Sequence, residues 1–293
     1  MSRFRHFAAI DWSGAAGERQ GGIAVALAGA DGAPALLRPG HRWSRIEVLD
    51  WLVADLPPAT LVGLDLGISL PFADCGAFFP GWRDSPPDAR ALWTLVEAIC
   101  ANEPHLGVGS FVDHPEASRH FRRVGGREGD LFHLPGTGHR RGRLRVTEGA
   151  QADRLGCRPT SNFNLVGAAQ VGKASLAGMR LLHRLPPSLP VWPVDPLPTA
   201  GSVVVEIYTA IPALAAGRTT GRSKMRDMAA LNAALLEFDS PPIPATGPVT
   251  DHAADALLAA AWLRQAADDP ALWHPPAMSP HLAATEGWTF GVP

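Results

Sequence analysis

Acidic side chains stand at the ends of two short apolar segments, where they could take part in metal chemistry. Residues 7–10 run directly into Asp11, which is followed by the turn-forming pair Ser13-Gly14. Residues 60–64 end in the same way at Asp65. Short apolar segments closed by turn formers predict buried strands. A carboxylate at the end of a buried strand is costly unless a cation, a hydrogen-bond donor or water meets it.

Three further acids could meet these two. Glu206 lies within the β-branched run 202–208, which predicts a strand, while Asp251 and Asp255 open the final predicted helix. The two aspartates are four residues apart, so they share a helix face with Cβ atoms ~6 Å apart. Two carboxylates 4 Å apart repel by ~4 kcal/mol at an effective dielectric constant of about 20. A cluster of such groups therefore protonates or separates unless a cation is present.

Magnesium is the natural cation, because it takes oxygen ligands and commonly keeps waters and substrate phosphates around it. The absence of a cysteine cluster or a spaced histidine pair argues against zinc. The sequence thus predicts one or two Mg²⁺ or Mn²⁺ ions on five ligands: Asp11, Asp65, Glu206, Asp251 and Asp255. Three of these acids also have plainer interpretations. Asp11 could be a turn residue, Asp251 a first-turn helix acid, and Glu206 half of a core ion pair with an arginine.

Basic residues that could contact substrate phosphates occur mainly in the glycine-rich segment 119–145, which shows no hydrophobic period and predicts a long loop. The predicted substrate-binding residues are Arg140, Arg141, Arg143, Arg145 and Lys173. A solvated loop, and an exposed helix position for Lys173, are the alternatives. His252 could donate a proton beside the acid pair, although a surface or capping role is favoured for it. Glu148, just after the loop, is either an additional metal ligand or a surface acid.

The composition indicates a globular α/β chain. The 293 residues are 46% hydrophobic and 18% charged, and the formal net charge is −2, which gives no global reason to expect nucleic acid. The N-terminal apolar run is too short for a signal peptide and no segment approaches membrane-spanning length. The sequence therefore predicts a cytoplasmic chain without membrane or protein partners.

The predicted order of elements is three strands, a helix, a strand and a second helix, after which an insertion interrupts this order. Strands are expected over 7–10, 21–28, 33–38 and 60–64, and helices over 44–56 and 85–102. Residues 104–200 form an insertion that holds the basic loop, a helix over 163–185 and a proline-rich connector over 186–198. The strand 202–208 follows, and then helices over 211–216, 223–238 and from Thr250 onward. We expect a single domain over 1–293.

This order, with acids on the first and fourth strands and the last helix, resembles the ribonuclease H-like fold. More narrowly, the chain resembles the predicted-nuclease family called domain of unknown function 429. The segments that carry this resemblance are AAIDWSGA (8–15), GLDLGISLPF (63–72), RVTE (145–148), FNLVGAAQVGKASLAGM (163–179), VVVEIYTAIPAL (203–214) and DHAADALLAA (251–260). The resemblance implies a mixed five-stranded sheet ordered 3-2-1-4-5, with a large insertion before the last strand. It also implies metal-dependent nuclease chemistry carried by Asp11, Asp65 and Asp255, with nucleic acid as substrate.

Two other functions remain open at the level of sequence. One is a non-catalytic binding module that keeps the fold and its acid pocket. The other is a phosphotransferase of the actin-like ATPase and sugar-kinase type, whose domains share the sheet topology. Asp65-Leu66-Gly67 fits the phosphate turn of such proteins loosely, and Asp11-Trp12-Ser13-Gly14 fits it poorly.

Overall fold

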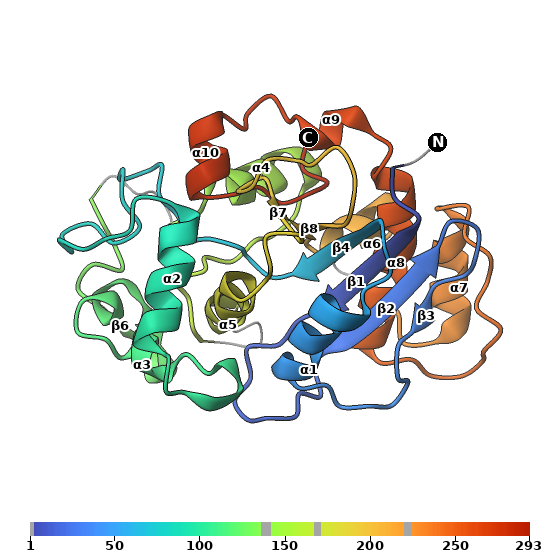
Figure 1. The fold of residues 1–293 in the computed structure, drawn as a ribbon, viewed down its shortest axis with the longest axis horizontal. Helices are drawn as coiled ribbons and strands as arrows, with labels where there is room; N and C mark the ends of the chain where they lie inside the picture. The colour runs from blue at the N-terminus through green and yellow to red at the C-terminus, as the bar shows by residue number, and fades with distance from the viewer. Residues whose placement is uncertain (1–2, 136–141, 167–170, 220–223) are drawn as a thin grey trace.

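The fold is a mixed α/β architecture built on one six-stranded sheet (Figure 1). In this computed structural model we describe residues 3–135, 142–166, 171–219 and 224–293. The main strands are β1 (His6–Asp11), β2 (Ala24–Gly29), β3 (Ala35–Leu36), β4 (Thr60–Asp65), β7 (Val191–Trp192) and β8 (Val203–Glu206). Their order is β3-β2-β1-β4-β8-β7. β1 pairs antiparallel with β2 and parallel with β4, and β8 runs parallel to both β4 and β7.

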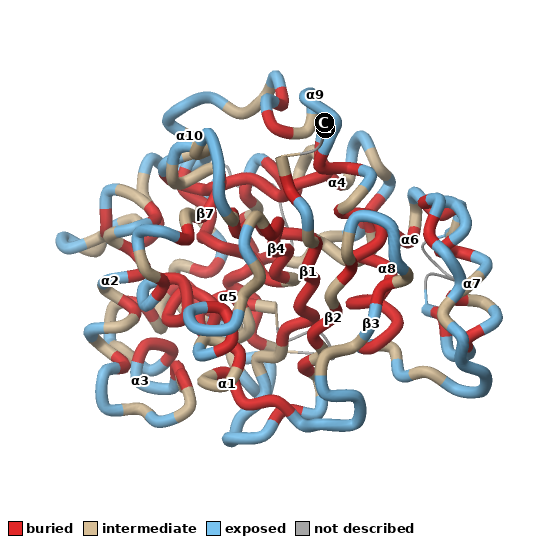
Figure 2. The backbone as a smooth tube through the Cα atoms, turned by 45° about the vertical axis from the view of Figure 1, so that its right-hand side comes forward, coloured by how far each residue is buried: buried red, intermediate tan, exposed pale blue. Residues whose placement is uncertain are grey.

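The central strand β1 is covered on both sides, as its continuous apolar sequence predicts. Because successive side chains on a strand point to opposite faces, Ala8 and Ile10 join one hydrophobic core while Phe7 and Ala9 join the other. The first core is completed by α1 (Arg45–Asp50), α2 (Ala89–Ile99) and α5 (Val171–His183). The second is completed by α6 (Ala210–Ala215), α7 (Met228–Leu236), α8 (Asp251–Ala266) and α9 (Pro270–Trp273). Figure 2 shows β1 and β4 as buried segments inside this shell.

Local capping signals place several helices where the sequence predicts them. Ser44 and Glu47 form the predicted capping box of α1, which continues as a π-helical turn over Trp51–Asp55. The Thr250 hydroxyl accepts from the backbone of Ala253 and so begins α8. The predicted start of α2 at residue 85 is wrong by one turn, because Asp88 is its N-cap.

The segment 104–200 contains more structure than predicted. The basic loop includes a small hairpin of β5 (Arg122–Arg123) and β6 (Arg127–Glu128), and α4 (Val146–Leu155) follows it. Short helices occur at α3 (Gly109–Val112) and, near the C-terminus, at α10 (Pro280–Thr285). Within the predicted connector, β7 extends the sheet to six strands rather than five. In the described part of the chain, no helix has both the length and the apolar character needed to span a membrane.

Candidate active site

Asp11 and Asp65 are neighbours in the sheet. They are the last residues of the parallel strands β1 and β4, and their Cα atoms are partners in register. Adjacent strands lie ~4.8 Å apart, so the two carboxylates emerge side by side at one edge of the sheet. The convergence of these two strand-end acids, which the sequence suggested only by repetition, follows from the parallel pairing of their strands.

The helix α8 brings a third carboxylate to the same place. Asp255 lies in the second turn of this helix and is buried. Burial raises the pKa of Asp255, and the charges of Asp11 and Asp251 raise it further, although Lys224 opposes this. Burial likewise raises the pKa of Asp65 to about 8; repulsion by Asp11 and Asp255 adds to the shift, and hydrogen bonds from Thr209 oppose it. These three acids therefore share one electrostatic environment.

Each carboxylate of this trio has a different polar partner. His252 Nδ1 lies 2.9 Å from Asp11 Oδ2, and Lys224 Nζ lies 2.6 Å from Asp255 Oδ2. The Thr209 hydroxyl donates to Asp65 Oδ2 at 3.0 Å. Asp251 stands outside this trio, one turn earlier on α8, where Arg226 Nε is 3.6 Å from its carboxylate.

His252 is an exposed residue, as the favoured surface interpretation predicts, and its ring also contacts Asp11. The hydrogen bond to Asp11 raises the pKa of its imidazole, which favours the protonated ring. The ring also lines a cavity, and a Cβ atom on Gly22 would lie 3.4 Å from its Nε2. Gly22 thus leaves open space beside this nitrogen.

Lys224 was not singled out from the sequence, although it is one of only two lysines in the chain. Its ammonium group neutralises part of the charge on Asp255, and the pKa of Lys224 is raised because Asp255 and Asp11 outweigh the opposing effect of burial. The scarcity of lysine was the one available signal. Nothing in the neighbouring sequence indicates which acid the side chain reaches.

Glu206 does not join the trio and instead forms the core ion pair that was its alternative interpretation. Its carboxylate accepts from Arg145 Nη1 at 2.8 Å and Nη2 at 2.6 Å. The backbone amide of Ile68 and the hydroxyl of Thr289 donate to it as well. This buried carboxylate is therefore satisfied by four donors, so we remove Glu206 from the predicted metal ligands.

Arg145 and Arg143 also lie inside the protein rather than on a phosphate-binding strip. Arg145 bridges Glu206 and Glu148, whose carboxylate also accepts the Arg145 backbone amide at 2.6 Å. Burial, together with Glu206, raises the pKa of Glu148 to about 7 despite the neighbouring Arg145. Arg143 pairs with Asp74 and donates to three backbone carbonyls. The predicted substrate contacts of these two arginines are corrected to structural ones.

The remaining predicted substrate-binding residues differ in position. Arg140 and Arg141 lie outside the described residues. Lys173 is in the first turn of α5, where it lines a cavity that is separate from the cavity at Asp65 and His252.

The carboxylate cavity, which has Asp65, Glu148 and Glu206 in its wall, has a volume of about 470 Å³; Asp11 and Asp255 are not among the residues that line it. Trp12, Tyr208 and Ile207 provide apolar surface, and Asp65 and His252 provide titratable groups. Arg145, Glu148 and Glu206 form part of the wall. A pocket of this size with convergent polar groups and an acid of shifted pKa is a candidate active site.

The predicted ligands are not preassembled as a metal centre. Over the described ranges, no group of three or more His, Cys, Asp or Glu side chains is arranged to hold a metal ion. The reason is visible in the hydrogen bonds, since His252, Thr209 and Lys224 each engage a different acid of the trio. The donor atoms have the oxygen chemistry that Mg²⁺ requires. An ion on these ligands would have to displace Lys224 from Asp255.

The chain matches no family model, no curated protein and no solved structure in the three comparisons made with known proteins.

Proposed function

We propose that the chain hydrolyses phosphodiester bonds of nucleic acid in a divalent-ion-dependent reaction at Asp11, Asp65 and Asp255. The observation that carries this proposal is the in-register pairing of Asp11 with Asp65 at the ends of parallel strands, with Asp255 facing them from α8. The proposal includes a ribonuclease H-like fold and membership of the domain of unknown function 429 family. The strand order β3-β2-β1-β4-β8 supports that assignment, with β7 as an addition at the edge.

Mg²⁺ or Mn²⁺ suits this trio because all its donors are carboxylate oxygens and their mutual repulsion favours a bound cation. Such an ion supplies Lewis-acid polarisation of the phosphoryl group when it is bound. Asp11, Asp65 and Asp255 would hold it, and Thr209 orients Asp65 through its hydroxyl and backbone amide.

In the proposed reaction His252 transfers a proton. Asp11 orients its ring through Nδ1 and favours its protonated form, while the ring faces the cavity. In this arrangement the imidazolium can donate a proton to the departing oxygen of a phosphodiester, and the neutral ring can accept one. Trp12 and Tyr208 provide apolar surface for the substrate on the same cavity.

A non-catalytic binding module is the second candidate, because Lys224 and His252 already compensate two of the three acids. In that case the trio would be a neutralised polar cluster, and the cavity would bind a ligand without chemistry.

The experiment combines metal binding with substrate cleavage. Wild type and the variants Asp11→Asn, Asp65→Asn and Asp255→Asn are titrated with Mg²⁺ and Mn²⁺ by calorimetry, then tested on single-stranded DNA, duplex DNA, RNA–DNA hybrid and branched substrates. We expect metal-dependent cleavage by wild type and a loss of at least about 100-fold in each variant. ATP hydrolysis, measured alongside, identifies a phosphotransferase.

Asp31→Asn is the matched control, since Asp31 is an exposed acid in the turn after β2, at the opposite end of the sheet from Asp11. We expect this variant to behave like wild type. Metal affinity that is identical in wild type and all three trio variants would contradict the proposal, as would cleavage that persists without Asp65.

A further inference from the structure

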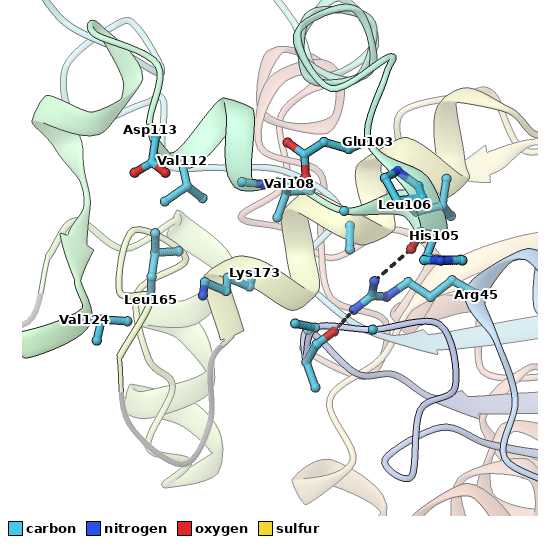
Figure 3. A pocket seen from close by; sticks show the side chains of 18 of the residues that line it. Arg45, Glu103, His105, Leu106, Val108, Val112, Asp113, Val124, Leu165 and Lys173 are labelled. Carbon is cyan, nitrogen blue, oxygen red and sulfur yellow. Dashed lines mark hydrogen bonds between the residues drawn. The ribbon is translucent and has the colours of Figure 1, made fainter.

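A second cavity of about 570 Å³ lies beside the carboxylate cavity. Figure 3 shows residues of this second cavity, which come from the loop after β1, from residues 103–113, from the hairpin β5–β6 and from the start of α5. The two cavities share Gly14 and Ala15 in their walls. The loop after β1 is therefore a wall common to the two cavities.

The boundary between the cavities is a close backbone contact. A Cβ atom on Gly14 would lie 2.4 Å from the backbone nitrogen of Ala174, so only glycine lets the loop approach α5 this closely. The Trp12 indole donates to the Ala174 carbonyl at 3.0 Å, and this hydrogen bond also holds the loop against α5. Lys173 and Ala174, adjacent on α5, line the second and the first cavity respectively.

The wall of the second cavity contains a buried guanidinium that lacks a carboxylate partner within the described ranges. Arg45 is 3% exposed, and its four hydrogen bonds all go to carbonyl oxygens, those of Ser13, Ala15 and His105. Buried charges are normally paired with an opposite charge. A guanidinium has five N–H donors, so Arg45 has one that none of these bonds uses. An anion in this cavity would supply the missing charge.

Other cations of the same wall also have donors to spare. In the described part of the chain, neither Lys173 nor Arg127 makes a side-chain hydrogen bond or ion pair. Arg123 pairs with Asp113 through Nη1 at 3.1 Å, but its buried Nε has no partner among the described atoms. The remaining acid, Glu103, accepts backbone amides of Gly109 and Ser110. The lining is therefore positive in balance.

We propose that this second cavity binds the sugar–phosphate backbone of a single-stranded nucleic acid next to the bond cleaved at the carboxylates. The inference rests on the proposed function for the identity of its ligand. Lys173 and Arg127 contact phosphate, and Arg45 provides a fixed positive charge behind them. The apolar lining is aliphatic, so it packs against sugars without stacking on bases, and recognition is independent of sequence. Its members are Leu106, Val108, Val112, Val124 and Leu165.

A cavity of this size buries most of one small ligand, so it has room for one or two nucleotides of a strand and excludes a duplex. The same phosphate chemistry could come from a free nucleotide or from inorganic pyrophosphate. In the proposed binding mode a strand passes over the Gly14–Ala15 loop, which lines both cavities, because the contact of this loop with α5 closes the direct route between them.

The test measures binding separately from cleavage. The anisotropy of a fluorescent oligodeoxythymidylate is followed with the full-length protein in EDTA over a range of salt concentrations. We expect Lys173→Gln and Arg127→Gln each to weaken binding by roughly fivefold to tenfold. Each variant should also reduce the slope of log K against log salt by about 0.7. Arg5→Gln is the matched control, because Arg5 is exposed just before the opposite end of β1.

Several results would overturn the proposal. The proposal fails if Lys173→Gln and Arg127→Gln bind the oligonucleotide as tightly as wild type does. It also fails if Arg5→Gln loses as much affinity as they do. Pyrophosphate that competes at the same concentration as unlabelled oligonucleotide would show a mononucleotide site instead of a strand path. If wild type cleaves nothing while Lys173→Gln still weakens binding, the proposed function fails and the strand site stands. If wild type cleaves and both variants bind normally, the strand site alone fails.

Discussion

At the scale of residues, the site is defined by which cation or donor meets each acid. Asp11, Asp65 and Asp255 are close enough to influence one another, and each has its own polar partner. Glu206 carries the same kind of carboxylate but is satisfied by a buried guanidinium. The difference between an acid of the trio and an acid of the core ion pair is therefore the neighbouring group, and not the residue type.

The raised pKa of Asp65 gives a prediction about stability and pH. Its pKa of about 8 in the folded protein is above the ~3.9 of an unfolded aspartate. The folded state therefore binds more protons between these values, and stability decreases as pH rises from about 4 through 8. We expect Asp65→Asn to remove this decrease, so that at about pH 9 the variant is more stable than wild type by on the order of 2 kcal/mol.

Urea unfolding in EDTA between about pH 5 and pH 9 measures this effect. Asp31→Asn again serves as the exposed control and should follow the wild-type curve. If wild type and Asp65→Asn had parallel pH profiles, the carboxyl of Asp65 would not titrate as expected.

At the scale of elements, the site depends on how closely the loop after β1 approaches α5. Gly14 is needed there because any side chain would meet the backbone of Lys173 and Ala174. Arg45 donates to the carbonyls of Ser13 and Ala15 and so holds the same loop from the side of α1. The ends of β1 and β4, the loop after β1 and the starts of α1 and α5 thus meet at this edge of the sheet.

We expect Gly14→Ala to destabilise the protein by about 1–3 kcal/mol, because the backbone atoms that the new methyl group meets cannot rotate away. The free energy of unfolding in urea measures the change. Gly29→Ala is the control, since a Cβ atom at Gly29 would meet no other atom within 4 Å. Equal stabilities for Gly14→Ala and wild type would contradict the close contact.

At the scale of the whole molecule, a buried network joins segments that are far apart in the chain. Arg145 at the start of α4 contacts Glu206 at the end of β8 and the backbone carbonyl of Glu286 near the C-terminus. Glu286 in turn accepts the backbone amides of Phe72, Ala73 and Val146. The network fastens the C-terminal segment and α4 to the sheet behind the carboxylate cavity.

We expect Arg145→Met to cost about 3–5 kcal/mol of folding free energy, because it leaves Glu148 and Glu206 buried without their shared cation. Thermal and urea unfolding measure the loss. The control is Arg83→Met, which changes an exposed arginine and should alter stability by less than about 0.5 kcal/mol. The structural role would be contradicted if Arg145→Met changed the free energy of unfolding only slightly but weakened substrate binding. That result would instead support the predicted substrate contact of Arg145.

Features that depend on residues close together in the chain could be predicted, and features that depend on distant pairing could not. The capping box of α1 and the Thr250 cap of α8 were predicted because a cap involves residues only three apart. The strands β1 and β4 were predicted because their apolar runs are continuous. The two-residue strand β7 and the hairpin β5–β6 were missed, since such short strands have no readable period and exist only through pairing with neighbours.

The sequence by itself determined that acids would end two buried strands and begin the helix α8, because burial and capping are encoded in adjacent residues; α9 and α10, which follow α8, were not predicted. Only the tertiary structure decided which charges meet. Asp11 finds His252, 241 positions away, and Glu206 finds Arg145, 61 positions away. Such pairings result from strand order and helix packing, so no local pattern could separate the acids of the trio from the acid of the core ion pair.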